Sequence, residues 1–138
     1  MKEKTFLDWQ WLDQKVLELT ETIQESNEKF KFISGVPRGG LIPGICISHR
    51  LGIKYIPYSE AKNLSPSERS KTLVVDDICD SGETLLHTSG LGFKTATLTL
   101  RYSAPYQPNF YSEKVEDDSW LVFPWEREDS KTIQDYLA

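Results

Sequence analysis

An apolar run that stops at a pair of aspartates limits the folds open to this chain. Residues 72 to 76 read TLVVD, and a further aspartate follows directly. A strand that is apolar on both faces must be covered on both faces, which is typical of the centre of a parallel sheet packed between helices. We therefore predict a buried central strand over residues 72 to 76.

Elsewhere the chain alternates between strand-like and helix-like patterns. Apolar residues recur at steps of four, three and four from Leu12 through Val16 and Leu19 to Ile23, which predicts a helix over residues 8 to 25. Helices that alternate with strands predict an α/β fold with a mostly parallel central sheet, whose ligands bind at the carboxyl ends of the strands. The remaining predicted helices are 41–52 and 83–92, and the remaining predicted strands are 30–36, 53–58, 94–102 and a last one within 119–125.

Three segments lack the apolar patterns that predict a buried helix or strand. Residues 59 to 71 are interpreted as a polar surface loop. Residues 103 to 118 are interpreted as a long loop with two prolines, whose acidic run from 113 to 118 is solvated. Residues 128 to 138 at the end of the chain are expected to form an outer helix.

Length and composition exclude several classes of protein. The chain has 138 residues, of which 38% are hydrophobic, so one domain over residues 1 to 138 is expected. A net charge of -5 argues against binding to nucleic acid, which needs a basic surface. No apolar run approaches the length of a membrane span, so no stable membrane insertion is expected. Cys46 and Cys79 have no metal-ligand spacing, which favours a reduced, cytoplasmic protein.

The acidic residues after the central strand are candidates for binding a ligand. Asp76 and Asp77 are expected at the carboxyl end of that strand. Adjacent carboxylates accept hydrogen bonds from vicinal hydroxyls, and they help to hold a hard cation that prefers oxygen ligands. The pair therefore predicts a site for a sugar diol and a metal ion.

A turn that opens the next helix follows at once. It consists of Asp80, Ser81, Gly82, Glu83 and Thr84. Backbone N–H groups in such a turn, together with the helix N-terminus, form a cradle for a phosphate. Gly82 allows close approach of the ligand, and the hydroxyls of Ser81 and Thr84 add donors. The alternative interpretation is an ordinary turn in which Asp80 or Ser81 caps the helix.

A second glycine-rich turn follows the strand predicted at 30–36. It consists of Pro37, Arg38, Gly39 and Gly40. An arginine beside bare backbone amides can bind an anion, although Pro-x-Gly-Gly is also an ordinary turn.

The string LVVDDICDSGETL resembles the phosphoribosyl pyrophosphate (PRPP) motif of the type I phosphoribosyltransferases. GVPRGGLIPGICISHRLGI is similar to the corresponding part of the bacterial xanthine–guanine phosphoribosyltransferases. The resemblance implies that Asp76 and Asp77 bind the ribose and Mg²⁺. It also implies that residues 80 to 84 bind the 5′-phosphate, and that residues 37 to 40 bind the pyrophosphate with a cis bond before Arg38.

The same resemblance extends to a purine site. Arg101 stands where these enzymes have a lysine that contacts the exocyclic oxygen of the purine, and Trp120 matches the aromatic residue that stacks on the ring, with Leu121 beside it. Asp80 matches the general base. From the residues alone, Arg101 could equally be a solvated strand end, and a tryptophan near a strand end is more often part of the core.

The implied fold is that of a type I phosphoribosyltransferase with a shortened flap, because only residues 59 to 71 occupy the place of the family's flap. The implied reaction transfers 5-phosphoribosyl from PRPP to a 6-oxopurine and releases pyrophosphate, as in purine salvage. The family commonly forms dimers or tetramers, so a homodimer or homotetramer is expected.

Three alternatives remain open. The first is a PRPP- or nucleotide-binding regulatory protein of the same fold without catalysis, which the short flap favours. The second is a phosphoribosyltransferase for another base, such as a pyrimidine. The third is a receiver-like or phosphatase-like protein that holds Mg²⁺ on Asp76 and Asp77, although the Ser-Gly-Glu-Thr sequence would then have no role.

Overall fold

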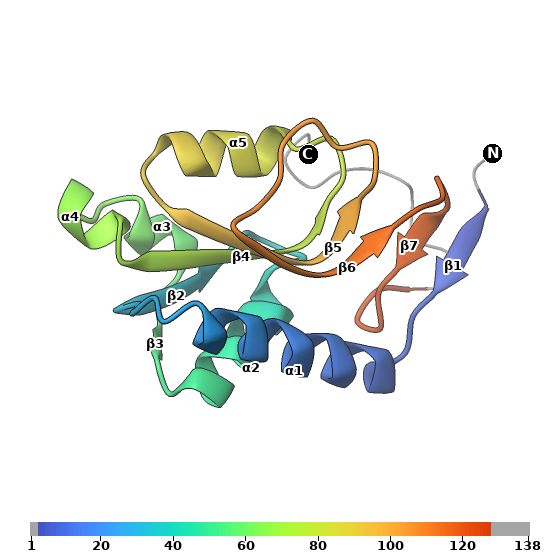
Figure 1. Cartoon of the computed structure of the whole chain (residues 1–138), viewed down its shortest axis with the longest axis horizontal. Helices are drawn as coiled ribbons and strands as arrows, with labels where there is room; N and C mark the ends of the chain where they lie inside the picture. Colours follow the sequence, from blue (N-terminus) through green and yellow to red (C-terminus); the bar gives the residue numbers. More distant parts are fainter. Residues whose placement is uncertain (1–2, 128–138) are drawn as a thin grey trace.

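A computed structural model describes residues 3 to 127 of the chain. Its centre is a five-stranded sheet in which all neighbouring strands are parallel, in the order β3-β2-β4-β5-β6 (Figure 1). The α/β fold and parallel sheet predicted from the sequence are therefore confirmed. The strands of this sheet are β2 (Phe32–Gly35), β3 (Lys54–Tyr55), β4 (Thr72–Cys79), β5 (Lys94–Arg101) and β6 (Phe110–Val115).

Helices cover both faces of the sheet. In Figure 1, α1 and α2 lie on one face and α5 lies on the other, with α3 and α4 near the start of β4. The predicted helix boundaries are close to those observed, because the sequence contains the capping residues. Asp8 accepts a hydrogen bond from the N–H of Trp11 at 2.7 Å, and Gly52 ends α2 in the left-handed conformation with a φ of 67°. The helices are α1 (Trp9–Glu25), α2 (Leu41–Leu51), α3 (Tyr58–Ala61), α4 (Pro66–Arg69) and α5 (Glu83–Gly90).

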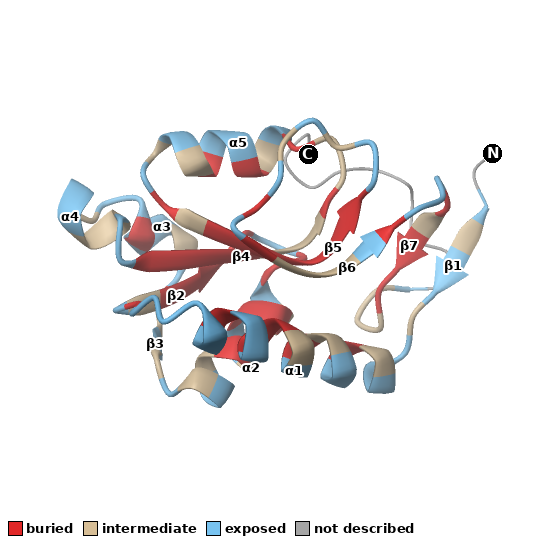
Figure 2. Ribbon diagram, in the orientation of Figure 1, coloured by how far each residue is buried: buried red, intermediate tan, exposed pale blue. Residues whose placement is uncertain are grey.

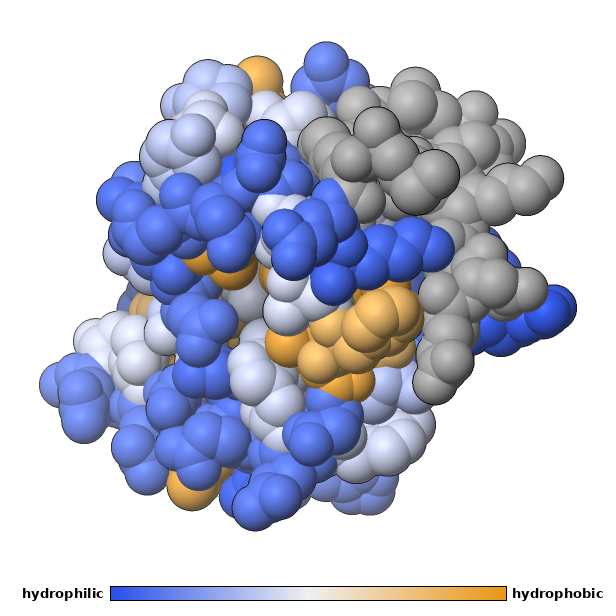
Figure 3. Space-filling view, turned by 90° about the vertical axis from the view of Figure 1, so that its right-hand side faces the viewer, coloured by the Kyte–Doolittle hydropathy of each residue, from blue (hydrophilic) through white to orange (hydrophobic). Residues whose placement is uncertain are grey.

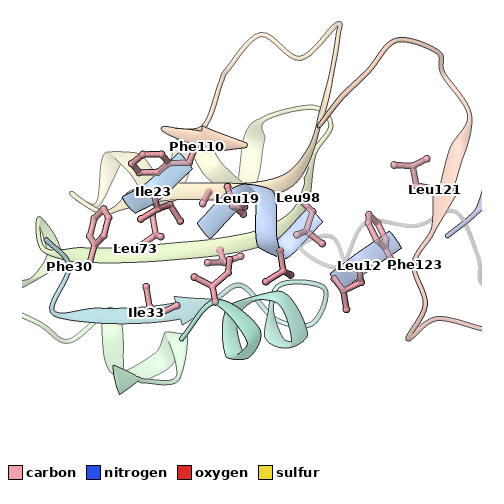
Figure 4. Packing of buried hydrophobic residues seen from close by; sticks show 14 of the residues in the cluster. Leu12, Leu19, Ile23, Phe30, Ile33, Leu73, Leu98, Phe110, Leu121 and Phe123 are labelled. Atoms are coloured by element: carbon pink, nitrogen blue, oxygen red, sulfur yellow. The ribbon is translucent and has the colours of Figure 1, made fainter. Parts of the chain in front are cut away.

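The main core lies between the sheet and the layer formed by α1 and α2. All four apolar residues that predicted α1 are buried, in one cluster with residues of β5 and β6. Figure 4 shows Leu12, Leu19 and Ile23 of α1 in this cluster with Leu98 and Phe110. Leu73 and Val75 of β4 point into this core, whereas Val74 points into a second cluster on the opposite face. β4 is therefore buried on both faces, as the dense apolar run predicts (Figure 2).

The strand order places a crevice between the ends of β2 and β4. From β2 the chain passes through α2 to β3 at one edge of the sheet, then returns to β4 on the other side of β2 and continues outward to β5 and β6. Connections that leave β2 and β4 toward opposite faces open a gap at the carboxyl ends of these strands, where α/β sheets of this kind bind ligands.

One strand of the sheet was not expected. Residues 103 to 118 were predicted to be a loop, but Phe110–Val115 form β6, which pairs with β5. The two prolines do not interrupt this strand, because both precede it. They lie in residues 102 to 109, the crossing segment, which connects the end of β5 to the start of β6. This crossing segment is anchored at Thr95, whose N–H donates to the side-chain oxygen of Asn109 at 2.9 Å and whose hydroxyl bonds the hydroxyl of Tyr106 at 3.1 Å.

Two further predictions about secondary structure need correction. The polar segment from 59 to 71 contains α3 and α4 rather than only a loop, because Pro57 and Ser65 precede short helical turns. The predicted last strand is β7 (Trp120–Val122), but it pairs with β1 (Lys4–Phe6) in a separate two-stranded parallel sheet. The helix predicted over 128 to 138 lies outside the described residues.

Across residues 3 to 127, none of the helices combines the length and the apolar character that crossing a membrane requires.

Candidate active site

A cavity of about 110 Å³ opens at the carboxyl ends of β4 and β5. Figure 3 views this end of the molecule, where a small apolar area is set among hydrophilic side chains. Most of the residues predicted for the site lie around this one cavity. Of the predicted residues, those that line it are Pro37, Asp76, Asp77, Asp80, Ser81, Gly82, Thr84, Arg101, Trp120 and Leu121.

Asp76 and Asp77 lie within a strand rather than after its end. The predicted strand stopped at residue 76, but β4 continues to Cys79 because β5 still pairs with it. On its other side β2 ends at Gly35, opposite Val75, so the aspartates follow the point where β4 loses one neighbour. The Asp77 N–H donates to Oδ1 of Asp76 at 2.8 Å. This arrangement holds both carboxylates at the edge of the crevice.

The turn after β2 packs against these carboxylates. The bond between Pro37 and Arg38 is cis, as the resemblance predicts. A Cβ on Gly39 would lie 2.2 Å from Oδ2 of Asp77, so glycine is required for the turn and the carboxylate to lie side by side. Pro37 lines the cavity, whereas the other three predicted residues of this turn, Arg38, Gly39 and Gly40, do not.

The turn after β4 has the shape of an anion cradle rather than of a side-chain cap. Gly82 is the N-cap of α5, with a φ of 85° and no side-chain capping bond, so the interpretation of Asp80 or Ser81 as the cap is wrong. Ser81 instead accepts from the N–H of Glu83 through its hydroxyl at 3.3 Å. The first amides of α5 therefore face the end of the cavity that Ser81, Gly82 and Thr84 line.

Arg101 is a buried charge and not a solvated strand end. Its side chain is 4% exposed, and its Nε donates to Oδ1 of Asp80 at 3.3 Å. Its Nη1 donates to the backbone oxygen of Asp117 at 2.9 Å. The guanidinium is thus held between two acceptors while it lines the cavity.

The small sheet supplies the apolar wall of the cavity. Trp120, at the start of β7, is only partly buried and lines the cavity together with Leu121 and Phe123. Phe123 is held from behind by the ring of Trp125, which stacks on it with centroids 5.1 Å apart. Trp120 is therefore available to a flat ligand, which the interpretation as a core residue would not allow.

Several residues at the site were not singled out from the sequence. Asp117 falls in the run interpreted as solvated, yet it holds Arg101. Tyr106 of the crossing segment packs on the turn that precedes α5, because a Cβ on Gly82 would lie 3.0 Å from the Cβ of Tyr106. Phe123 and Glu126 also line the cavity. No local pattern marks these positions, since each reaches the site only through the pairing of distant strands.

The segment in place of the flap lies away from the cavity. None of the described residues from 58 to 71 lines it. The hydroxyl of Tyr58 bonds that of Thr88 on α5 at 2.8 Å, and Ser65 caps α4. These residues therefore belong to the layer that covers the sheet.

Cys79 lies in the motif but is chemically protected. Burial, followed by the nearby charges of Asp76 and Asp80, raises the pKa of its thiol to about 11. Its sulfur contacts the backbone oxygen of Tyr106 at 3.2 Å. At neutral pH the reactive thiolate is therefore scarce.

The described residues contain no group of three or more histidine, cysteine, aspartate or glutamate side chains that could hold a metal ion. Asp76 and Asp77 are adjacent oxygen donors, which fits an ion such as Mg²⁺ that keeps most of its ligands as water and substrate phosphate oxygens.

No family model matches the sequence. Among solved structures, the chain is similar to a purine phosphoribosyltransferase from Pyrococcus horikoshii, with 27% identity and a TM-score of 0.75 over 96% of this chain and 99% of that one. It is similar to a hypothetical protein from Neisseria gonorrhoeae with bound ppGpp, with 21% identity and a TM-score of 0.76 over 94% and 92% of the two chains.

A third similar structure is the xanthine-guanine-hypoxanthine phosphoribosyltransferase of Helicobacter pylori, with 18% identity and a TM-score of 0.77 over 91% and 93% of the two chains. These matches span nearly the full length of both partners. The chain therefore has the type I phosphoribosyltransferase fold.

Proposed function

We propose that this protein is a purine phosphoribosyltransferase that transfers the 5-phosphoribosyl group of PRPP to a 6-oxopurine such as guanine, xanthine or hypoxanthine. The bond between the ribose C1 and the diphosphate oxygen breaks, and a bond between C1 and a purine ring nitrogen forms. The diphosphate leaves with the electron pair of the broken bond, and the ring nitrogen loses its proton. The products are a nucleoside monophosphate and pyrophosphate.

The observation that carries this proposal is the set of residues that line the cavity at the carboxyl ends of β4 and β5. The carboxylates of β4 can accept hydrogen bonds from a diol, and the turn before α5 can bind an anion. Beside them, β5 contributes a charged hydrogen-bond donor, Arg101, and β7 contributes an aromatic side chain, Trp120. A sugar that bears a phosphate at one end and a base at the other requires these parts in this order.

The chain positions the sugar through Asp76, Asp77 and the turn that follows them. The carboxylates accept hydrogen bonds from the ribose hydroxyls, and the amides of residues 81 to 84 bind the 5′-phosphate. Mg²⁺ held by the same carboxylates and by PRPP would neutralise charge on the leaving diphosphate. Arg38 and the turn around it are assigned to that diphosphate, because the turn packs on Asp77.

The base is assigned to the opposite end of the cavity. Trp120 and Leu121 offer flat apolar contact to the ring. Arg101 donates to the 6-oxo oxygen, and Asp80 accepts the ring proton as general base. Because Arg101 also contacts Asp80, both groups are oriented before the base arrives.

A second candidate function is regulatory binding of a guanine nucleotide without turnover. It is favoured by the position of the flap segment, none of whose described residues lines the cavity, so closure over the reactive sugar has no visible source there. The similar protein from Neisseria gonorrhoeae, which was crystallised with ppGpp, shows the same fold with such a ligand.

The experiment that separates the two candidates is a turnover assay with PRPP, Mg²⁺ and one base at a time. Guanine, xanthine, hypoxanthine, adenine and uracil are compared for formation of nucleotide and pyrophosphate. We expect turnover of at least one 6-oxopurine, and a loss of at least a hundredfold in kcat in Asp80→Asn. The matched control is Asp118→Asn, an exposed carboxylate outside the cavity.

The outcomes of this assay are distinct. Binding of guanine nucleotides without turnover of any base would overturn the catalytic proposal and support the regulatory one. Turnover of uracil alone would assign a pyrimidine. A homodimer or homotetramer and a cytoplasmic location remain the expectations for the active protein.

A further inference from the structure

We propose that Asp117 is a positioning residue that fixes the guanidinium of Arg101 for recognition of the base. The inference rests on the proposed function for its ligand, but the contacts that carry it are independent of any substrate. The proposal gives a role to residues 116 to 119, the acidic turn between β6 and β7. Neither the motifs nor the resemblance singled out this turn.

Two of the three nitrogens of Arg101 are already engaged by the protein. Nε donates to Asp80, and Nη1 donates to the backbone oxygen of Asp117. Among the described residues, Nη2 donates to no protein acceptor, while Arg101 lines the cavity. The planar fork therefore presents one nitrogen to a ligand in an orientation set by the other two.

The carbonyl of Asp117 is held in place by its own side chain. Oδ1 of Asp117 accepts from the N–H of Ser119 at 3.1 Å and from its hydroxyl at 2.7 Å. These hydrogen bonds lower the pKa of the Asp117 carboxyl. They close a tight turn over residues 117 to 119, and this turn aims the backbone oxygen at Arg101.

A hydrogen bond also connects this turn to the two-stranded sheet of β1 and β7. The hydroxyl of Ser119 accepts from the hydroxyl of Thr5 on β1 at 3.0 Å, and Ser119 is buried. β7 begins at the next residue, Trp120. The arginine that contacts the base and the aromatic ring that stacks on it are therefore held by the same short segment.

Geometry rather than charge is expected to dominate the effect of Asp117. Its carboxylate lies 3.9 Å from Nη1 of Arg101, and the side chain is 73% exposed. A charge pair at that distance and exposure is strongly screened by water. The carbonyl contact at 2.9 Å lies on a nearly buried cation, so it is the stronger of the two.

This distinction yields three variants with different expected results. Asp117→Asn keeps an oxygen that accepts from Ser119 and loses only the charge, so the turn is retained. Asp117→Ala removes both hydrogen bonds that close the turn, whereas Ser119→Ala removes only the one from the hydroxyl and keeps the one from the N–H. Asp118→Ala is the matched control, because it removes an exposed charge from the neighbouring position.

The first test is a ¹H–¹⁵N spectrum of the arginine side chains of the full chain. We expect the Nη–H signals of Arg101, assigned by their absence in Arg101→Lys, to be protected from solvent exchange in the wild type, in Asp117→Asn and in Asp118→Ala, because Nη1 is the nitrogen that donates to Asp117. We expect at least tenfold faster exchange in Asp117→Ala, and a smaller increase in Ser119→Ala, which keeps the hydrogen bond from its N–H. Unchanged exchange in these two variants would overturn the proposal, whether or not the protein is an enzyme.

The second test compares two probe ligands by calorimetry. Inosine monophosphate occupies the whole cavity, whereas ribose 5-phosphate lacks the base. We expect Asp117→Ala to weaken inosine monophosphate about tenfold, because one charged hydrogen bond no longer orients Arg101, and to change ribose 5-phosphate less than twofold. Equal weakening of both ligands would indicate a general structural role and would overturn the assignment.

The two tests separate failure of this inference from failure of the proposed function. If no purine nucleotide binds the wild type while Arg101 exchange still responds to Asp117→Ala, the proposed function fails and the positioning of Arg101 stands. If the wild type turns over a 6-oxopurine and its KM for the base is unchanged in Asp117→Ala, the function stands and the positioning role fails.

Discussion

Arg101 and Asp80, which both line the cavity, form an ion pair with 3.3 Å between Nε and Oδ1. The side chain of Arg101 is 4% exposed and that of Asp80 is 26% exposed. The residue assigned to contact the base and the residue assigned as general base therefore depend on each other for their orientation.

This pair predicts a measurable coupling in stability. In a double-mutant cycle with Asp80→Asn and Arg101→Met, we expect a coupling energy of about 1 to 2 kcal/mol, because each single change leaves the remaining group partly buried with fewer partners. The free energies of unfolding are measured by urea denaturation of the four proteins. A coupling energy below about 0.3 kcal/mol would show that the two groups act independently.

Gly39 predicts a specific loss of PRPP binding. In Gly39→Ala the new Cβ would lie 2.2 Å from Oδ2 of Asp77, so the carboxylate must move away from the site assigned to the ribose. We expect the affinity for PRPP in the presence of Mg²⁺ to fall at least tenfold, measured by calorimetry. The control is Gly90→Ala on α5, where nothing lies within 4 Å of a new Cβ. Equal affinity in the two variants would contradict the assigned role of the turn.

Gly82 and Gly52 allow a matched test of the turn that precedes α5, which is proposed to bind the 5′-phosphate. Both have positive φ, 85° and 67°, so alanine at either position is expected to cost about 1 to 2 kcal/mol of stability. Only Gly82 lies at the cavity, where a Cβ would also press on Tyr106 at 3.0 Å. We therefore expect Gly82→Ala alone to weaken binding of ribose 5-phosphate, measured beside Gly52→Ala at a temperature where both are folded.

Glu18 predicts a loss of stability in acid. Hydrogen bonds from Gln14 and Ser112, followed by one from Lys15, lower the pKa of Glu18 from 4.5 to about 2. A carboxylate whose pKa is lower in the folded protein stabilises the fold above its unfolded value near 4.5, and this stabilisation is lost as the pH falls toward 2.

The measurement compares the wild type with Glu18→Gln from pH 7 to pH 2. The side chain of Glu18 is 37% exposed, so we expect a difference of only about 1 kcal/mol at pH 7 after screening by water. The difference should disappear by about pH 2. A constant difference across this range would mean that the charge of Glu18 does not contribute.

Elements built from local patterns were predicted well. The apolar periodicity of α1, the left-handed glycine that ends α2 and the buried run of β4 are properties of neighbouring residues, so they are visible before the chain folds. The same holds for the turn around Gly82, because a glycine between a strand and a helix is a local signal for a turn.

Elements that depend on distant partners were missed or misplaced. β6 alternates few apolar residues and is recognisable only through its pairing with β5. β4 extends past Asp76 because β5 continues beside it, and β7 pairs with β1, which lies more than a hundred residues earlier in the chain. Such strands are stabilised by hydrogen bonds to other segments and leave a weak mark on their own sequence.

The same distinction between local patterns and distant partners applies to the candidate site. The acidic pair and the turn that follows it lie within one short segment, because a strand end and a helix start bring their donors and acceptors together. The sequence of this segment was therefore enough to predict a site for a sugar diol and a phosphate, which stays a prediction. The environment of Arg101 arises from three segments, since Asp80 follows β4, Arg101 ends β5 and Asp117 follows β6. Whether that arginine is solvated or buried between two acceptors depends on how these strands align, and only the folded sheet decides their alignment.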